Sequence, residues 1–166
     1  MKKIDFSSTF LLDALREEEL IQIATQWSEH ATKGSVVALS GNVGAGKSVW
    51  IRAAIRYLFG QEDRVISSPT FGFVHTYQKK VHPTVHHFDL YRLPSEQKFL
   101  TLGFQEYFSS QAIVFIEWAD RIASLLPLET ELFILWHQNA HHRKLSYSPS
   151  LPAKWIDDPM LYNPAD

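Results

Sequence analysis

Residues 41–48, Gly-Asn-Val-Gly-Ala-Gly-Lys-Ser, fit the pattern G-x-x-x-x-G-K-[ST] at every fixed position, and this stretch decides the fold. In this pattern the glycines let successive backbone N–H groups turn toward a phosphate, because they adopt angles that a side chain forbids. The lysine carries a positive charge to the outer phosphates, and the serine hydroxyl is a ligand of Mg²⁺. The loop residues that we expect to bind ATP, with Mg²⁺ as its cofactor, are Asn42, Val43, Gly44, Ala45, Gly46, Lys47 and Ser48.

The segments on either side of this loop have the pattern that a P-loop requires. Residues 36–39, Val-Val-Ala-Leu, are a continuous apolar run and predict a buried strand before the loop. After the loop, apolar residues at helical spacing predict a helix over residues 49–59 that ends at Gly60. Strand, loop and helix together disfavour the alternative of an incidental glycine-rich turn.

The other periodicities predict an α/β fold, a single P-loop NTPase domain with a mixed parallel and antiparallel sheet flanked by helices. A helix is expected over residues 15–30, with Asp13 as a plausible N-cap. Strand texture begins at Val65-Ile66. Residues 71–77 and 85–89 predict an antiparallel hairpin beside the nucleotide strand.

Later segments complete this expected sheet. Residues 113–116 predict another buried strand, and residues 131–136 and 144–147 predict a second hairpin. Residues 1–149 are expected to form the P-loop ATPase domain. Residues 150–166 are rich in proline and are expected to be a tail without an independent fold.

The composition is that of a globular protein and gives no general signal for gripping nucleic acid. The 166 residues are 45% hydrophobic and 20% charged, with a formal net charge of −2, so binding to nucleic acid or an anionic membrane needs a local patch or a partner. The sequence has no cysteine, no apolar run near the roughly 18 residues of a membrane span, and no signal-peptide pattern at its start. The expected location is the cytoplasm, without membrane attachment.

Two acids follow predicted strands and are candidates to hold Mg²⁺ beside the loop. Asp89 and Glu117 both stand at strand ends, where a P-loop protein needs an acid on a neighbouring strand. Each has a structural alternative, because Asp89 could cap the next turn and Glu117 could pair with Arg121. The expected metal ligands are Ser48, Asp89 and Glu117.

Thr70 is a candidate for the nucleotide site, and its alternative stays open. A hydroxyl beside the rigid Pro69 could reach the γ-phosphate and Mg²⁺, as the threonines of switch loops do. A plain turn explains the same residues at least as well.

The eight histidines do not indicate a zinc site. His86 and His87 are neighbours on a predicted strand and therefore point to opposite faces. The cluster near the last predicted turn has no cysteine and no ordered spacing, so it reads as a solvated, locally basic loop. Trp27, Trp50 and Trp136 are expected to pack in or near the core.

Four segments together resemble the bacterial TsaE (YjeE) ATPases, in order and in spacing, over roughly residues 15–148. These segments are residues 41–48, Ser68-Pro69-Thr70-Phe71, His87-Phe88-Asp89-Leu90-Tyr91-Arg92-Leu93 and Ile116-Glu117-Trp118. The last two strings are far more specific than the P-loop, which many families share. The resemblance implies a small P-loop ATPase with a mixed sheet.

The resemblance also implies a role in making threonylcarbamoyladenosine, the modified adenosine next to the anticodon in tRNAs that read codons beginning with A. TsaE proteins bind a heterodimer of TsaB and the transferase TsaD, and their ATPase cycle is thought to reset that complex between turnovers. We therefore expect a Mg²⁺-dependent ATPase that is slow alone and faster with TsaB–TsaD. It should meet tRNA only through that complex and not transfer the group itself.

Residue by residue, the resemblance implies Lys47 and Glu117 as the catalytic residues and Asp89 as the second acid of the site. Thr70 matches a switch-like threonine. Arg143 falls roughly where the last hairpin of the family approaches the adenine, which makes it a candidate ATP-binding residue.

The sequence departs from the family pattern at a few positions. Asn42 stands where the family usually has an acid, Val43 replaces leucine, and Gly72 replaces a polar β-branched residue. Ser48 replaces threonine but keeps the hydroxyl, so metal binding should survive. The role of Trp118 stays open between nucleotide contact and partner contact.

The alternative function is a small P-loop kinase for a metabolite. Kinases of this size carry an arginine-rich lid, whereas Arg52, Arg56 and Arg64 are scattered here. A GTPase is disfavoured because the sequence has no N-K-x-D motif. A nucleotide-binding module without turnover survives if Glu117 is only structural.

Overall fold

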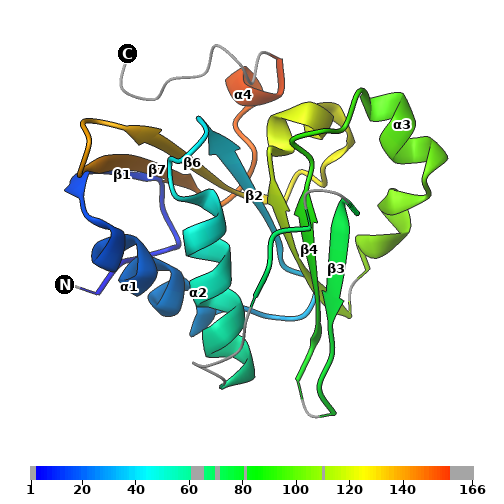
Figure 1. The fold of residues 1–166 in the computed structure, drawn as a ribbon, viewed down its shortest axis with the longest axis horizontal. Coiled ribbons are helices and arrows are strands. Elements are labelled where there is room, and N and C mark those ends of the chain that lie inside the picture. Colours follow the sequence, from blue (N-terminus) through cyan, green and yellow to red (C-terminus); the bar gives the residue numbers. More distant parts are fainter. Residues whose placement is uncertain (1–2, 61–65, 70–71, 81, 110, 158–166) are drawn as a thin grey trace.

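Seven strands form one sheet in the order β1-β7-β6-β2-β5-β4-β3 (Figure 1). The computed structural model describes residues 3–60, 66–69, 72–80, 82–109 and 111–157. The strands are β1 (Phe10–Leu15), β2 (Val36–Gly41), β3 (Val74–Tyr77), β4 (Thr84–Asp89), β5 (Ala112–Glu117), β6 (Glu131–His137) and β7 (Arg143–Ser148). The helices are α1 (Glu17–Ser28), α2 (Lys47–Phe59), α3 (Glu96–Thr101) and α4 (Ala153–Asp157), with two 3-10 helices, η1 (Phe104–Tyr107) and η2 (Ala119–Leu125).

The centre of the sheet is parallel and its two edges are antiparallel. Strand β2 pairs in parallel with β5 on one side and β6 on the other, and β5 pairs in parallel with β4. Strands β3, β7 and β1 complete the edges as antiparallel partners of β4, β6 and β7. The predicted mixed sheet and both predicted hairpins are therefore confirmed.

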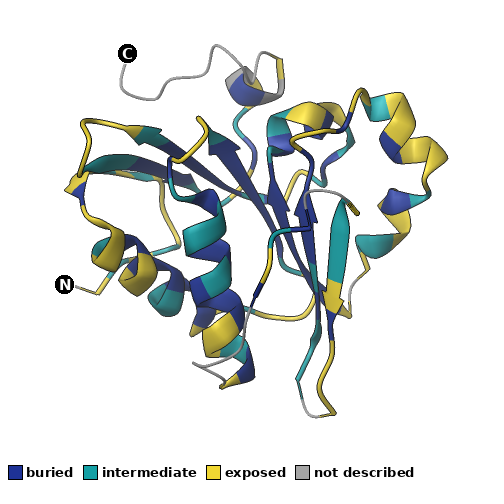
Figure 2. Cartoon of the chain, viewed as in Figure 1, coloured by how far each residue is buried: buried dark blue, intermediate teal, exposed yellow. Residues whose placement is uncertain are grey.

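The alternation of side chains along the strands sorts the core into two layers. Val37, Leu39 and Phe115 face α1 and α2, where they pack with the buried Trp27 and Trp50. Residues one position along, such as Ala38 and Val114, face the other side with side chains of α3, η1, η2 and α4. Figure 2 shows the central strands as a buried sheet between these layers. Of the three tryptophans predicted in or near the core, Trp27 and Trp50 are buried there, and Trp136 is half-buried against the other layer.

The prediction for the first helix was wrong at its start, because an unpredicted strand, β1, occupies residues 10–15. Asp13 lies in that strand, 3.2 Å from the ammonium nitrogen of Lys144, and does not cap the helix. The N-cap is Arg16, whose backbone N–H donates to the carboxylate of Glu19 at 2.9 Å. Pairing with β7 keeps the chain extended as far as Leu15, so the helix begins later than its periodicity alone indicates.

The first predicted hairpin does not lie beside the nucleotide strand, since β5 stands between β4 and β2. All six residues of β5 are buried, and a strand buried on both faces is stable when both of its edges are paired in parallel. Strand structure was expected near Val65-Ile66, but Ile66 is buried outside any strand. Val65 lies outside the described residues. Strand β3 begins at Val74, and residue 71 is also outside the described ranges.

The predicted tail contributes two side chains to the core. Leu151 and Trp155 are buried in the layer that contains α3 and η2, and Trp155 lies in the short helix α4. The division at residue 149 stays a prediction. In the part of the chain that the structure describes, no helix has the length and apolar character needed to span a membrane.

Candidate nucleotide site

The loop between β2 and α2 has a backbone that its glycines make feasible. Gly41 has φ +123°, and a Cβ atom there would lie 1.8 Å from the carbonyl oxygen of Leu135 on β6. Gly46 has φ +110°, and a Cβ atom there would lie 2.8 Å from a methyl carbon of Leu20 on α1. Both positions therefore require glycine, and the close approach fixes the loop between β6 and α1 just before α2 begins.

Lys47 is the first residue of α2, and its ammonium group lies inside the loop. Its Nζ donates to the carbonyl oxygens of Gly41 at 2.6 Å and Asn42 at 2.8 Å, and only 4% of the residue is exposed. Burial lowers the pKa of Lys47 to about 8, against the attraction of Glu117 and two nearby aspartates, which raises it. The loop thus holds a poorly solvated cation that an anion such as phosphate would stabilise.

Glu117 and Ser48 meet at the carboxyl end of the central strands. Glu117 is the last residue of β5, its Cα is paired with that of Leu39 on β2, and 2% of it is exposed. Ser48 Oγ donates to Glu117 Oε2 at 2.6 Å. The alternative pairing with Arg121 is not formed among the described residues, where Arg121 donates instead to the carbonyl oxygen of Leu93 at 3.4 Å.

Asp89 lies next to Glu117 but has different partners. The two residues are paired across β4 and β5. Asp89 Oδ1 accepts from the backbone N–H of Tyr91 at 3.1 Å, and Oδ2 accepts from Ser68 Oγ at 2.6 Å. Asp89 therefore does cap the following turn, as its structural alternative proposed, while it also faces the same cavity as Glu117.

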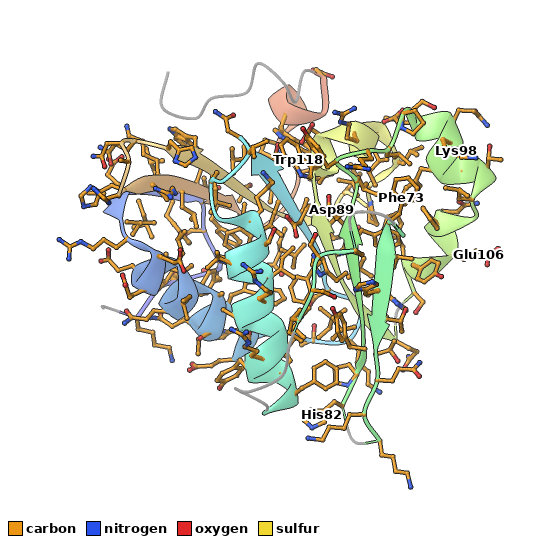
Figure 3. All side chains as sticks on the ribbon, viewed as in Figure 1. Phe73, His82, Asp89, Lys98, Glu106 and Trp118 are labelled. Carbon is orange, nitrogen blue, oxygen red and sulfur yellow. The ribbon has the colours of Figure 1, made fainter. Side chains whose placement is uncertain are left out.

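A cavity of about 420 Å³ joins these groups. Figure 3 shows Asp89 and Trp118 near the carboxyl end of β2, and both line this cavity. The described residues that line it are Val43, Gly44, Gly46, Lys47, Ser48, Val49, Arg52, Ser68, Asp89, Tyr91, Glu117 and Trp118. The structure thus brings most of the predicted phosphate and metal residues into one space, and Thr70 falls outside the described residues.

Trp118 covers the lysine from the side of β5. Its ring centroid lies 3.8 Å from Lys47 Nζ, a cation–π distance. The residue has φ +60°, unusual for a bulky side chain, and its ring packs against Tyr91 with centroids 4.9 Å apart. Within the cavity, the Trp118 ring therefore contacts the ammonium group of Lys47.

A second cavity, of about 490 Å³, lies on the other side of the loop, and Arg143 is among its lining residues. Gly44 and Gly46 border both cavities. His137 Nε2 lies 3.2 Å from the carbonyl oxygen of Val43, which links the last hairpin to the loop. Arg143 thus lines a cavity that the loop also borders.

Sequence reasoning missed several residues of the site. Ser68 and Tyr91 occur inside the strings that carried the family resemblance, which was the available signal for them. Arg52 is four residues after Ser48, one helical turn along α2. His87 begins one of the same strings but was given no role in the site, yet its Nε2 lies 2.9 Å from Glu117 Oε1.

Comparisons with known proteins agree with these motifs. The family model described as "Threonylcarbamoyl adenosine biosynthesis protein TsaE" matches residues 14–145. A relative from Rickettsia conorii, named tRNA threonylcarbamoyladenosine biosynthesis protein TsaE, is 38% identical over 110 residues, which are 66% of this chain and 61% of the relative. The protein of the same name from Bacillus subtilis is 31% identical over 131 residues, 79% of this chain and 80% of the relative. The crystal structure of Bacillus subtilis YdiB is 26% identical, with a TM-score of 0.70 and 86% of each chain covered.

Proposed function

The chain belongs to the TsaE family, and from this premise we propose that it is a Mg²⁺-dependent ATPase of tRNA threonylcarbamoyladenosine biosynthesis. It works in the cytoplasm through a TsaB–TsaD heterodimer and resets that complex between turnovers. It does not transfer the threonylcarbamoyl group itself, and it meets tRNA only through the complex.

The observation that carries this proposal is the hydrogen bond between Ser48 and Glu117 beside Lys47. In P-loop NTPases, Mg²⁺ is held by the loop serine or threonine together with an acid on a neighbouring strand. Ser48 Oγ and Glu117 Oε2 are already 2.6 Å apart, and the Asp89 carboxylate lines the same cavity. All three side chains offer oxygen atoms as ligands, which fits Mg²⁺. This ion binds one or two carboxylates and leaves its other coordination positions to phosphate and water.

The roles of the residues follow from this arrangement. The loop N–H groups and the N-terminus of α2 bind the phosphates, and Lys47 exchanges its carbonyl partners for phosphate oxygens. Mg²⁺, when bound, neutralises charge on the outer phosphates. Glu117 orients the attacking water. Ser48 and Asp89 provide further oxygen ligands for Mg²⁺.

We expect slow hydrolysis by the chain alone. P-loop NTPases gain much of their rate from an arginine that reaches the transferred phosphoryl group, and a partner often supplies it. Among the described residues that line the cavity, the one arginine is Arg52, and it belongs to the helix that follows the loop. A partner that adds a cation at the open side of the cavity would raise the rate.

The test is ATP hydrolysis by the purified chain with and without a cognate TsaB–TsaD pair. We expect stimulation by the pair, loss of nucleotide affinity in Lys47→Ala, and binding with poor hydrolysis in Glu117→Ala. No binding to the pair and no stimulation would contradict the role in threonylcarbamoyladenosine formation. Normal hydrolysis by Glu117→Ala would remove Glu117 from the mechanism.

A further inference from the structure

His87 is a fully buried polar residue that the proposed mechanism does not use. It lies in β4 with 0% of its surface exposed, and its Nε2 is 2.9 Å from Glu117 Oε1. Its other ring nitrogen, Nδ1, is buried and has no hydrogen-bond partner among the described residues. Burying half of an imidazole without a partner costs free energy, so an apolar residue would serve the core better at this position.

The strand geometry explains why His87 reaches the site while its neighbour does not. Alternate residues of β4 face α2, so His87 lies on the same face as Asp89, two residues further along. His86 points the other way, where its Nδ1 lies 2.9 Å from Thr76 Oγ1 and its ring packs against Tyr107 with centroids 4.7 Å apart. The pair therefore provides one histidine in the site and one outside it.

Glu117 is held at both of its carboxylate oxygens. His87 contacts Oε1 from β4, and Ser48 contacts Oε2 from the first turn of α2. The carboxylate carries no hydrogen of its own, so the imidazole donates through Nε2 and its bare Nδ1 is the atom left without a partner. Two donors on different elements fix the orientation of the carboxylate, whereas Ser48 alone would leave Oε1 free to rotate.

We propose that His87 is a positioning residue that holds Glu117 in the orientation needed for Mg²⁺–nucleotide binding and hydrolysis. This inference rests on the proposed function, because it assigns His87 to the same site. Groups that hold a metal ligand from behind are worth about 10- to 100-fold in metal affinity or activity when they are removed. The expected loss falls on the Mg²⁺-dependent part of binding, since the loop and Lys47 stay unchanged.

The test compares three substitutions at one position. His87→Gln places an amide N–H where the imidazole Nε2 now lies, His87→Asn stops one methylene short, and His87→Leu removes the donor. Calorimetry would measure the affinity for a non-hydrolysable ATP analogue in EDTA and in Mg²⁺, and thermal melting would report folding. His86→Gln is the matched control, because it changes the neighbouring histidine on the opposite face.

We expect His87→Leu and His87→Asn to lose about tenfold or more of the affinity that Mg²⁺ adds, with affinity in EDTA within about twofold of the wild type. His87→Gln should recover most of the loss, and His86→Gln should show none. If His87→Leu does not fold, the Gln and Asn variants give the same comparison. An unchanged Mg²⁺ increment in the donor-less variants, or an equal loss in EDTA, would overturn the inference. A wild-type chain that binds no nucleotide would instead overturn the proposed function.

Discussion

Two glutamates flank β2, one on each of its neighbouring strands, and their local contacts are alike. Glu117 is the last residue of β5 and Glu131 the first residue of β6, the two strands that pair with β2. Each accepts a hydroxyl hydrogen bond at 2.6 Å, from Ser48 or from Tyr147. Each also contacts a ring nitrogen, that of a histidine at 2.9 Å or that of Trp27 at 2.7 Å.

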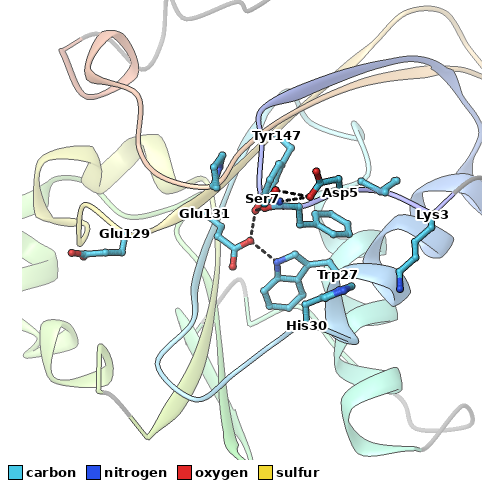
Figure 4. Close-up of a pocket in the computed structure, with 11 residues that line it drawn as sticks. Lys3, Asp5, Ser7, Trp27, His30, Glu129, Glu131 and Tyr147 are labelled. Carbon is cyan, nitrogen blue, oxygen red and sulfur yellow. Dashed lines mark hydrogen bonds between the residues drawn. The ribbon is translucent and has the colours of Figure 1, made fainter.

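The surroundings of the two glutamates differ in ways that matter for chemistry. Glu117 lines the same cavity as Lys47, Asp89 and the glycines of the loop. Glu131 lines a cavity of about 700 Å³ whose described residues include Lys3 and His30 but no part of the P-loop (Figure 4). A hydroxyl and a ring nitrogen that both contact a carboxylate therefore do not by themselves indicate a catalytic role. The neighbouring charge and backbone decide between the two.

Tyr147 contacts both Glu131 and the N-terminal segment of the chain. Its hydroxyl lies 2.9 Å from the carbonyl oxygen of Phe6 and 2.6 Å from Glu131 Oε2, yet it has one proton to donate. When Glu131 is protonated, it donates to Tyr147, and Tyr147 donates to Phe6. Burial raises the pKa of Glu131, against the hydrogen bonds of Tyr147 and Trp27 and the charge of His30, which lower it. Glu131 thus ties the N-terminal segment to β7 and α1.

The largest expected effect separates the two glutamates by activity. Glu117→Gln should reduce the rate of ATP hydrolysis by about 100-fold or more, because it removes the group that orients water. Glu131→Gln should leave that rate within about twofold. The measurement is phosphate release at saturating ATP and Mg²⁺ for both variants. Similar losses of rate in the two variants would contradict a catalytic role that is specific to Glu117.

The second-largest effect is on stability, and it concerns Glu131 instead of Glu117. Glu131→Ala should lower the free energy of unfolding by about 1–3 kcal/mol, because Trp27 Nε1 loses its acceptor. The Tyr147 hydroxyl keeps the carbonyl oxygen of Phe6. Urea denaturation measures this change. Glu129→Ala is the matched control, since Glu129 is exposed at the same cavity. An unfolding curve for Glu131→Ala that matches the wild type would show that the hydrogen bonds of Glu131 do not stabilise the fold.

A smaller effect isolates the hydroxyl group of Tyr147. Tyr147→Phe should lower the free energy of unfolding by about 1 kcal/mol, the usual value of one net hydrogen bond, and should reduce the melting temperature by about 2–4 °C. Tyr107→Phe is the control, because its hydroxyl makes no hydrogen bond within the described part of the chain. Equal shifts in the two variants would argue against the role of Tyr147.

The smallest expected effect is a pH dependence, because Glu131 is half-buried and its charge is partly screened by solvent. A carboxyl whose pKa is raised above its ordinary value of 4.5 by folding stabilises the folded state at low pH. That contribution is lost as the pH rises through the folded pKa. The stability of the wild type relative to Glu131→Gln should therefore decrease from pH 4 to pH 7 in urea titrations. A constant or growing difference would contradict a raised pKa.

The parts of the site that lie close together in the chain could be predicted from the sequence. The P-loop motif specifies strand, turn and helix within 25 residues, because glycine angles and apolar spacing are local properties. The acids were located by a strand followed by a carboxylate. The role of His87 could not be predicted, because it depends on which strand lies next to β4.

The edges of the sheet show the same limit. Strand β1 has no strong alternation of its own and forms because β7 offers it a partner more than a hundred residues away. The position of β5 between β4 and β2 likewise depends on long-range pairing, which local propensity does not encode.

Local patterns in the sequence were enough to predict the loop motif, the mixed α/β architecture and, through the longer strings, the family. The other neighbours of each carboxylate followed only from the tertiary structure: His87 at Glu117, and Tyr147 and Trp27 at Glu131. The physical reason is that a loop or helix forms from interactions a few residues apart. The environment of a buried carboxylate is instead built from side chains of three or more elements, which meet only after the sheet has formed.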